Sequence, residues 1–335
     1  MKIWHVTGPG AESLRMAEAD VPTPRWGEVL VQVDAVSLNY RDQLLIANDG
    51  YARFGLPFTP CSDMAGKIKA LGEGVSRFAV GDRVINNFNG GWLDGEPPRR
   101  DGEIASFGGP LPGTLAEYMA LPAEWLVKAP SSLSDAQASA LPCTGLTAWT
   151  SLIEIGRLSP GETVVVQGTG GFSLFALELA RKVGAEVIVT TTNAAKAERA
   201  YALGASHVVC RNDGKNWAEQ VKAITKGRGA DHILEVAGGH NLESSVAALA
   251  PGGRIALVGV IEGFDATFPS VSAIHSFATI QAIYVGHRAG LERLVRAVDT
   301  CGLSPAIDSE FDFADFPNAL SRLQQGPFGK VVVRA

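Results

Sequence analysis

The sequence predicts an α/β fold, with a doubly wound parallel sheet and a second, β-rich module. An apolar run at 163–167 leads into a glycine-rich turn, a helical pattern and a second apolar run at 187–189. Strand and helix patterns then keep alternating towards the end of the chain. The N-terminal third instead alternates apolar and polar side chains and is broken by Pro and Gly, which is typical of β structure. These observations predict two modules of different architecture.

The glycine-rich turn has the composition of a dinucleotide-binding site. It comprises Gly168, Thr169, Gly170, Gly171, Phe172 and Ser173. Gly168 permits the tight turn, Gly170 lets the backbone approach a pyrophosphate, and the N–H groups at the N-terminus of the following helix attract its negative charge. Ser173 takes the place of the usual third glycine, so we expect slightly looser contact between helix and strand. The alternative interpretation is a structural turn that binds no nucleotide.

The later alternation predicts the rest of the parallel sheet. We expect strands at 206–210, 231–236, 254–260 and 279–285, and helices at 216–225, 242–249 and 291–300. Crossovers between parallel strands of one sheet are right-handed, so these elements should build a doubly wound sheet. Ligands of such sheets bind outside the carboxyl ends of the strands.

The β-rich module is predicted to be discontinuous in sequence. Its strand patterns lie at 28–33, 66–72, 80–84 and 328–333. The last of these should rejoin the others, because it returns to a β pattern after the helices. We therefore expect a dinucleotide-binding domain at 124–268 and a catalytic domain formed by 1–123 and 269–335. The active-site cleft is expected between them, where ligands of such proteins commonly bind.

A long polar, glycine-rich segment lies at 86–112. Loops of this length in a compact domain are usually functional or mobile. Trp92 and Leu93 lie in its middle. Apolar side chains there could cap a pocket, or they could anchor the loop to the surface, and the sequence leaves both interpretations open.

Composition excludes several classes of function. The chain has 335 residues, of which 46% are hydrophobic and 19% charged, and its net charge is −6. Nucleic acid is therefore not expected as a partner, because phosphate binding needs a basic face. We expect no membrane-spanning segment and no secretory signal. The four scattered cysteines suggest reduced thiols and a cytoplasmic location. They are Cys61, Cys143, Cys210 and Cys301.

Eight short segments, spread over almost the whole chain, resemble the medium-chain dehydrogenase/reductase superfamily. They lie at 27–33, 39–42, 80–84, 113–118, 141–148, 168–173, 203–205 and 328–330. The resemblance implies a GroES-like domain together with a Rossmann domain. It also implies reversible hydride transfer between a nicotinamide cofactor and an alcohol or carbonyl, a quinone or an activated double bond.

The resemblance implies a zinc-less member of this superfamily. The positions that hold catalytic zinc in its zinc members are Asn39, Ser62 and Cys143 in this chain. Only Cys143 offers a ligand that zinc prefers, and one ligand cannot hold the ion. We therefore expect no zinc, and Cys143 is most simply a buried small residue. The matching branch is quinone oxidoreductase-like, and it includes proteins named zinc-type alcohol dehydrogenase-like.

Without a metal, the protein must polarise the hydride acceptor by hydrogen bonds and positioning. The candidates are Asn39, Tyr40 and Tyr51. Tyr51 matches a tyrosine of the quinone reductase active site, where a phenol could donate a hydrogen bond to a developing oxyanion. It could equally line the pocket.

The end of the second strand of the Rossmann pattern predicts NADP(H) over NAD(H). NAD-specific domains place a carboxylate there to bind the ribose hydroxyls. Here the positions hold Thr191, Thr192 and Asn193. Lys196 and Arg211 follow, and two cations suit a 2′-phosphate. The alternative interpretation is that Lys196 is an ordinary lysine on a helix surface.

The layout of the family implies further cofactor contacts and a partner. Ala237, Val258 and Val260 lie at strand ends that should face the ribose and nicotinamide, and Lys330 is expected near the pyrophosphate. A homodimer is expected through the edge strand at 279–285.

Three functions remain in competition. The first is an NADPH-dependent, zinc-independent reductase of a small-molecule quinone, enone or carbonyl substrate. The second is a zinc-independent NAD(P)-dependent alcohol dehydrogenase. The third is a non-catalytic nucleotide-binding protein that keeps the fold.

Overall fold

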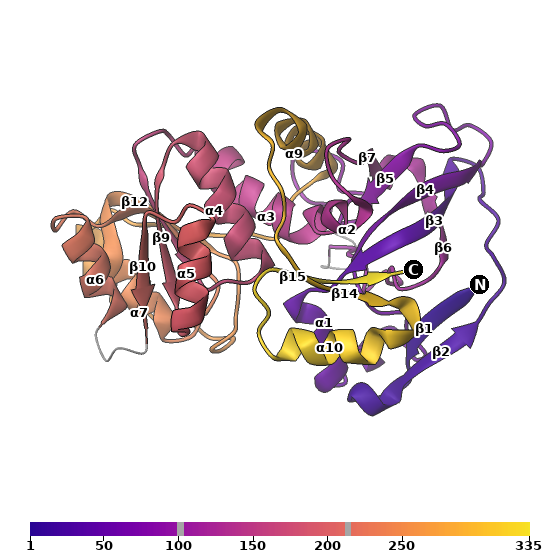
Figure 1. The fold of residues 1–335 in the computed structure, drawn as a ribbon, viewed down its shortest axis with the longest axis horizontal. Helices are drawn as coiled ribbons and strands as arrows, with labels where there is room; N and C mark the ends of the chain where they lie inside the picture. The colour runs from indigo at the N-terminus through magenta and orange to yellow at the C-terminus, as the bar shows by residue number, and fades with distance from the viewer. Residues whose placement is uncertain (99–103, 212–215) are drawn as a thin grey trace. The chain divides into compact units, whose positions relative to one another are not determined.

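The computed structural model describes residues 1–98, 104–211 and 216–335, and its chain forms two compact units (Figure 1). Unit 1 comprises Met1–Leu146 and Val285–Ala335, and unit 2 comprises Thr147–Tyr284. Each unit has its own sheet and its own apolar core. Within the described ranges, no helix is both long and apolar enough to cross a lipid bilayer.

Unit 2 contains a six-stranded sheet, whose strands are all parallel, in the order β10-β9-β8-β11-β12-β13. The strands are β8 (Thr163–Gln167), β9 (Glu186–Thr191), β10 (His207–Cys210), β11 (Ala230–Glu235), β12 (Leu249–Leu257) and β13 (Thr279–Ala282). The strand order reverses between β8 and β11, which follow one another in the sheet but not in the chain. The predicted doubly wound sheet is confirmed, and its switch point lies at the glycine-rich turn.

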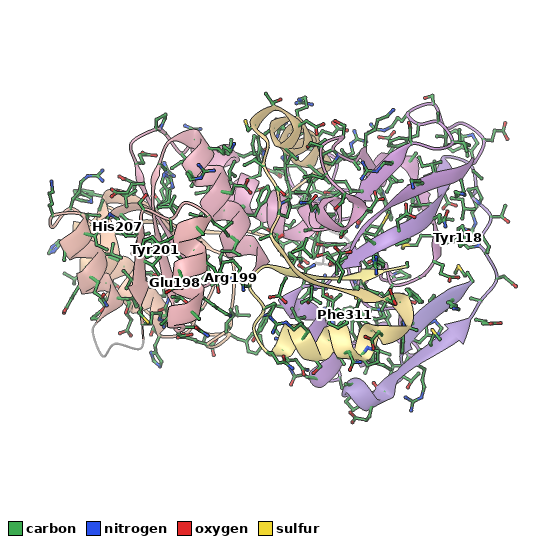
Figure 2. All side chains as sticks on the ribbon, in the orientation of Figure 1. Tyr118, Glu198, Arg199, Tyr201, His207 and Phe311 are labelled. Atoms are coloured by element: carbon green, nitrogen blue, oxygen red, sulfur yellow. The ribbon has the colours of Figure 1, made fainter. Side chains whose placement is uncertain are left out.

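Helices cover both faces of this sheet. They are α4 (Gly171–Val183), α5 (Ala194–Ala202), α6 (Trp217–Ile224), α7 (Asn241–Ala248) and α8 (Ser270–His275). Helices α4 and α5 lie on one face, and α6 and α7 pack together on the other (Figure 1). On the second face, Trp217 and Leu242 pack in one core with Ile233 of β11. On the first, the hydroxyl of Tyr201 on α5 accepts a hydrogen bond from the Val208 amide of β10 at 3.1 Å, beside His207 (Figure 2).

Unit 1 is built on a mainly antiparallel sheet in the order β14-β15-β3-β4-β5-β7, with β6 paired to β3 and a separate hairpin β1-β2. Its strands are β1 (Lys2–Val6), β2 (Leu14–Glu18), β3 (Glu28–Ser37), β4 (Asp63–Leu71), β5 (Arg83–Asn86), β6 (Tyr118–Pro122), β7 (Leu126–Lys128), β14 (Ile307–Asp312) and β15 (Lys330–Arg334). The predicted return of the C-terminal strand is confirmed, because Val332 of β15 pairs with Ser37 of β3.

Helices and helical turns complete unit 1. The helices are α1 (Tyr40–Ala47), α2 (Asp135–Ala138), α9 (Arg288–Cys301) and α10 (Phe316–Gln324). Helical turns lie at η1 (Ala11–Ser13), η2 (Ala52–Phe54), η3 (Ala123–Trp125), η4 (Leu141–Gly145) and η6 (Phe313–Asp315). Along the chain, α3 (Leu146–Trp149), which contains the boundary between the units, continues into the π-helical turn η5 (Thr150–Glu154) of unit 2. The core of unit 1 packs Phe316 and Leu320 of α10 together with Val331 and Val333 of β15.

Several predicted boundaries differ from the structure. Residues 124–146 belong to unit 1, because β7 pairs with β5, whereas 269–284 belong to unit 2, because β13 pairs with β12. The strand expected at 80–84 begins only at Arg83. The residues before it form a turn, in which Gly81 has a φ of +93° and Asp82 accepts a hydrogen bond from the Ala79 amide.

Candidate cofactor and active site

The glycine-rich turn leads from β8 directly into the N-terminus of α4. Gly168 has a φ of +77°, which favours glycine, and its amide donates to the Thr190 carbonyl of β9 at 2.8 Å. Gly170 precedes the helix, and no side chain of the described residues caps its first amides. A β-carbon added at Gly168 or Gly170 would meet nothing within 4 Å. The turn therefore leaves open space beside a helix N-terminus, the arrangement that attracts phosphate.

Ser173 fastens this helix to its strand. Its side chain is buried, and its hydroxyl donates to the Gln167 carbonyl at the end of β8 at 2.7 Å. A glycine could not make this bond. The slightly looser contact between helix and strand stays a prediction, and the hydroxyl supplies a hydrogen bond where a third glycine would allow only close backbone packing.

The end of β9 carries neutral side chains, as the sequence shows. Thr191 Oγ1 accepts from the Asn193 amide at 3.2 Å. Asn193 Oδ1 in turn accepts from the Ala195 amide at 2.9 Å, which caps helix α5. Thr192 is exposed and Lys196 is half-buried in the first turn of that helix. The expected ribose-binding positions therefore lie together where β9 ends.

Arg211 lies at the same edge of the sheet. Its amide donates to the Thr191 carbonyl at 2.7 Å, so the structure brings these two predicted residues together. Its guanidinium, however, forms an ion pair with Glu262, with 3.0 Å between Nη2 and Oε1. Glu262 was not predicted, because it lies far from the glycine motif in the sequence and matches no motif.

The other predicted cofactor residues gather at the ends of β11 and β12. The Val258 amide donates to the Glu235 carbonyl at 2.9 Å, and the Glu262 amide donates to the Ala237 carbonyl at 2.6 Å. Ala237 is buried and Val260 is 37% exposed. The Ile261 amide donates in turn to the Val236 carbonyl at 3.4 Å, so the segment after β12, which contains Val258 and Val260, runs beside the segment after β11, which contains Ala237.

A buried polar network that the sequence did not predict supports this edge. The Glu235 carboxylate is 0% exposed and accepts from the Ala237 and Gly238 amides at 2.8 and 2.9 Å. It also accepts from the side chains of Gln167 and Asn241 at 3.0 and 2.8 Å, and from the Ser245 hydroxyl. Because Gln167 ends β8, the network joins the glycine-rich turn to the turn after β11.

In unit 1, buried polar side chains gather around Lys330 at the start of β15. The Lys330 ammonium donates to the Leu38 carbonyl at 2.6 Å and to Asn39 Oδ1 at 2.7 Å. The side-chain amide of Asn39 donates through Nδ2 to Ser62 Oγ at 3.1 Å, and the Ser62 hydroxyl donates to Asp63 Oδ1 at 2.7 Å. We call these side chains the Lys330 network. The contact of Lys330 with a pyrophosphate stays a prediction.

Burial raises the pKa values of the acids in and beside this network. The pKa of Asp42 rises to about 6, because loss of solvent outweighs the hydrogen bond from the Asn39 amide. Burial also raises the pKa of Asp63 against the opposing charge of Lys330. The Cys143 amide donates to Asp63 Oδ2 at 3.1 Å, and both burial and the Asp63 charge raise the pKa of the Cys143 thiol. That thiol is therefore protonated at neutral pH.

The chemistry of this cluster does not fit a catalytic zinc ion. The structure brings Asn39, Ser62 and Cys143 together around Asp63. Zinc prefers thiolate and imidazole ligands. Here Asn39 Oδ1 already accepts from the Lys330 ammonium and Ser62 offers a neutral hydroxyl, which leaves Cys143 alone among the three as a ligand of the kind that zinc prefers.

The three predicted catalytic side chains lie in different environments. Tyr51 is 0% exposed and stacks on Phe58 in the core of unit 1, with 5.0 Å between the ring centroids. Asn39 is 5% exposed and belongs to the Lys330 network. Only Tyr40, at the first position of α1, is exposed, at 38%. Burial therefore favours Tyr40 over Tyr51 for contact with a substrate.

The described part of the loop at 86–112 is anchored within unit 1. The carbonyls of Trp92 and Leu93 accept from the first amides of α9, those of Arg288 and Ala289, both at 3.0 Å. The Trp92 ring also packs edge-on against His287, with 5.8 Å between centroids. These contacts favour the interpretation in which the apolar side chains anchor the loop. Residues 99–103 of this loop lie outside the described residues.

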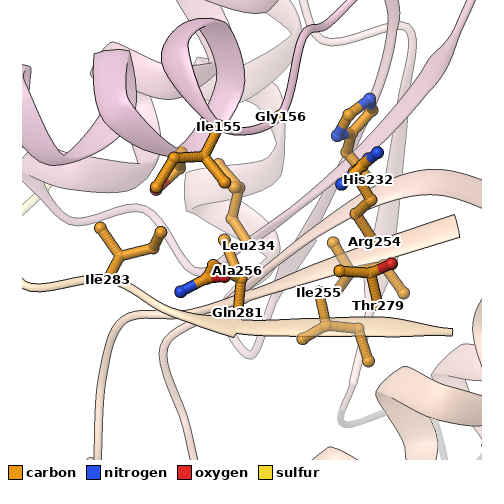
Figure 3. A pocket seen from close by; sticks show the side chains of 12 residues that line it. Ile155, Gly156, His232, Leu234, Arg254, Ile255, Ala256, Thr279, Gln281 and Ile283 are labelled. Carbon is orange, nitrogen blue, oxygen red and sulfur yellow. The ribbon is translucent and has the colours of Figure 1, made fainter.

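A small cavity in unit 2 lies away from the glycine-rich turn. It lies between the 151–156 segment and strands β11, β12 and β13 (Figure 3). Ile155 lines it from the helical side, and His232, Arg254 and Gln281 line it from the strands. Its free volume of about 10 Å³ holds at most about one water molecule. We therefore assign it no ligand.

Comparison with known proteins agrees with this architecture. Residues 25–131 match the family model of the alcohol dehydrogenase GroES-like domain, and residues 171–300 match that of zinc-binding dehydrogenases. The two matches fall on unit 1 and mainly on unit 2, respectively. They confirm the predicted pairing of a GroES-like domain with a Rossmann-like domain.

Individual relatives cover almost the whole chain. A zinc-type alcohol dehydrogenase-like protein of Schizosaccharomyces pombe is 36% identical, over 97% of this chain and 96% of its own length. Human quinone oxidoreductase is 27% identical over 77% of this chain and 72% of its own. A crystal structure from Sinorhizobium meliloti, provisionally described as an alcohol dehydrogenase, is 47% identical with a TM-score of 0.94, covering 100% of this chain and 98% of its own. The chain therefore belongs to the medium-chain dehydrogenase/reductase superfamily of nicotinamide-dependent oxidoreductases.

Proposed function

We propose that this oxidoreductase uses NADPH, without zinc, to reduce a quinone, an enone or a carbonyl compound. The observation that carries the cofactor proposal is the end of β9. It offers Thr191, Thr192 and Asn193 and no carboxylate, and the backbone of Arg211 is hydrogen-bonded to that of Thr191. A carboxylate there would repel a 2′-phosphate, whereas a guanidinium binds it with charge-assisted hydrogen bonds.

The Lys330 network supports a reaction that needs no metal. Hydride addition places negative charge on the substrate, and a conjugated quinone or enone spreads this charge without a Lewis acid. The network fixes Asn39, the residue before α1, between the Lys330 ammonium and Ser62. Its role is then to position the start of α1, where Tyr40 could donate a hydrogen bond to the developing oxyanion.

The cofactor proposal is tested by steady-state kinetics with NADPH and NADH. Replacing Lys196 and Arg211 by Ala should raise the KM for NADPH far more than the KM for NADH, because only NADPH carries the 2′-phosphate. Equal effects on the two cofactors would overturn the assignment.

The reaction class is tested by stopped-flow loss of absorbance at 340 nm with a panel of quinones, enones and aldehydes. Turnover should survive dialysis against a zinc chelator, and metal analysis of the active protein should find no stoichiometric zinc. Faster oxidation of alcohols than reduction of any panel member would favour an alcohol dehydrogenase. Cofactor binding with no turnover across the panel would favour a non-catalytic binding protein.

We further propose that unit 2 pairs with a second copy of the chain along β13. Among the described strands β13 lies at the edge of the six-stranded sheet, with β12 as its neighbour. Close to it in sequence, Val271, Ile274 and Phe277 are 64, 68 and 77% exposed. We call these three side chains the α8 patch. An unpaired edge strand beside an exposed apolar patch is the kind of surface that two-fold association buries.

A further inference from the structure

The ion pair between Arg211 and Glu262 connects two loops at the carboxyl edge of the unit 2 sheet. Arg211 follows β10, and Glu262 follows β12. Their side chains are 27 and 42% exposed, and 3.0 Å separates Nη2 from Oε1. The backbone amide of each residue also donates a hydrogen bond to another strand end, so the ion pair is an additional contact between the two loops.

The backbone hydrogen bonds of the two residues show which part of the sheet edge the ion pair spans. The Arg211 amide is bonded to Thr191, where β9 ends, and the Glu262 amide is bonded to Ala237, just after β11. Strand β8 lies between β9 and β11 in the sheet, and the glycine-rich turn follows it. The two anchors are therefore separated by two strand spacings, about 10 Å. The ion pair bridges the edge at the position of the glycine-rich turn.

We propose that Glu262 is a positioning residue that holds Arg211 until a 2′-phosphate replaces it. A dinucleotide that lies on the glycine-rich turn with its ribose at Thr191 crosses the line of the ion pair, so the pair must open. With NADPH, Arg211 exchanges the Glu262 carboxylate for the phosphate. With NADH, the guanidinium gains no new anion. The proposal rests on the proposed contact between Arg211 and the 2′-phosphate.

The cost of opening the pair is modest but measurable. Both side chains are partly exposed, and ion pairs of this kind change an equilibrium by up to about fivefold. The Glu262 carboxylate should therefore weaken the binding of each cofactor by about two- to fivefold. Only NADPH also gains a new contact in return, between its 2′-phosphate and the Arg211 guanidinium.

The test is a double-mutant cycle with Glu262→Gln, Arg211→Ala and the double variant, with Kd for NADH and NADPH measured by fluorescence titration. For NADH, each single variant should tighten binding about two- to fivefold, and the double variant should bind no tighter than either one. For NADPH, Glu262→Gln should tighten binding, whereas Arg211→Ala should weaken it. Glu186→Gln is the matched control, because Glu186 forms a surface pair with His207 at the opposite, amino edge of β9.

Each contrary result has a separate meaning. If Glu262→Gln changes neither Kd, the bridging role is overturned while the cofactor assignment stands. If Glu262→Gln still tightens NADH when Arg211 is Ala, Glu262 acts by repelling the dinucleotide, and the bridging role is again overturned. If Arg211→Ala tightens NADPH as much as NADH, the contact with the 2′-phosphate fails, and with it the cofactor proposal.

Discussion

Asp42 is a buried acid whose raised pKa makes the stability of the fold depend on pH. It occupies the first turn of α1 and is 0% exposed, and its Oδ2 accepts from the Asn39 amide at 2.7 Å. Its Oδ1 has no hydrogen-bond partner among the described residues. Burial disfavours the carboxylate and raises the pKa of Asp42 to about 6. The folded chain therefore prefers the neutral acid.

We predict that Asp42→Asn stabilises the protein at pH 7.5. The pKa of Asp42 in the folded chain lies above its ordinary value. Its contribution to the free energy of unfolding is therefore present in acid and is lost as the pH rises through about 6. An Asn mimics the neutral acid and should raise the free energy of unfolding at pH 7.5 by on the order of 2 kcal/mol. Urea unfolding at pH 4.5, 6 and 7.5 measures this effect, and the variant should show the flatter pH dependence.

Asp231→Asn provides a control of opposite sign. Burial opposes the charge of Asp231, but hydrogen bonds from Arg228 and from the Thr163 amide outweigh burial and lower its pKa. Its contribution is present above its ordinary pKa and is lost in acid. The variant should therefore be less stable than the wild type at pH 7.5. Stabilisation by both variants, or by neither, would contradict the assignment for Asp42.

The two tyrosines give a second prediction for single residues. Tyr40→Phe should lower kcat for the best panel substrate at least about tenfold, because it removes an exposed hydroxyl at the start of α1. Tyr51→Phe should leave kcat within about twofold, because its ring packs on Phe58 in the core. NADPH oxidation under saturating conditions measures both variants. A larger loss of kcat in Tyr51→Phe than in Tyr40→Phe would favour Tyr51 as the catalytic residue.

The residues of the candidate site could be predicted only in part. Thr191 and Arg211 were found because their positions follow from the length of a strand–helix–strand unit, which is local in sequence. Glu262 was missed because Arg211, its partner, lies 51 residues away along the chain, and Glu235 was missed because its link to Gln167 spans 68 residues. The position of Tyr51 in the core likewise depends on the fold of the whole 48–58 segment against Phe58, and no periodic pattern signals that.

At the scale of elements, substitutions in the glycine-rich turn should affect protein stability and cofactor binding to different extents. We predict that Gly170→Ala folds almost as well as the wild type, within about 0.5 kcal/mol, because its φ is −78° and the added carbon meets nothing. Gly168→Ala should cost about 1–2 kcal/mol, because its φ is +77°. Both should bind NADPH at least about tenfold more weakly if the pyrophosphate lies against the turn. Thermal unfolding and fluorescence titration separate the two effects, and unchanged NADPH binding by Gly170→Ala would contradict the proposed site.

The elements of unit 2 were predicted well because each helix follows its own strand. Strand β8 has the predicted bounds, and β10, β11 and β13 lie within a few residues of theirs. The unit boundaries were not predicted. They depend on β7 pairing with β5 and on β13 pairing with β12, and hydrophobic patterns do not show which strands become neighbours.

At the scale of the whole molecule, the exposed α8 patch predicts a homodimer. Val271→Glu should shift the protein towards the monomer, because it places a charge on a surface that pairing would bury. Val80→Glu is the matched control, since Val80 is 62% exposed in the Val80–Asp82 turn of unit 1, compared with 64% for Val271. Light scattering after size-exclusion chromatography measures the mass. A monomeric wild type, or equal effects of the two variants, would contradict the predicted interface.

The place of β15 beside β3 has a consequence for how the protein is made. The last strand of the chain, Lys330–Arg334, inserts between β14 and β3, and it also delivers Lys330 to Asn39. A ribosome synthesises unit 2 as one continuous segment before it synthesises β15. Unit 2 can therefore form during synthesis, whereas the sheet of unit 1 is complete only after β15 has been synthesised.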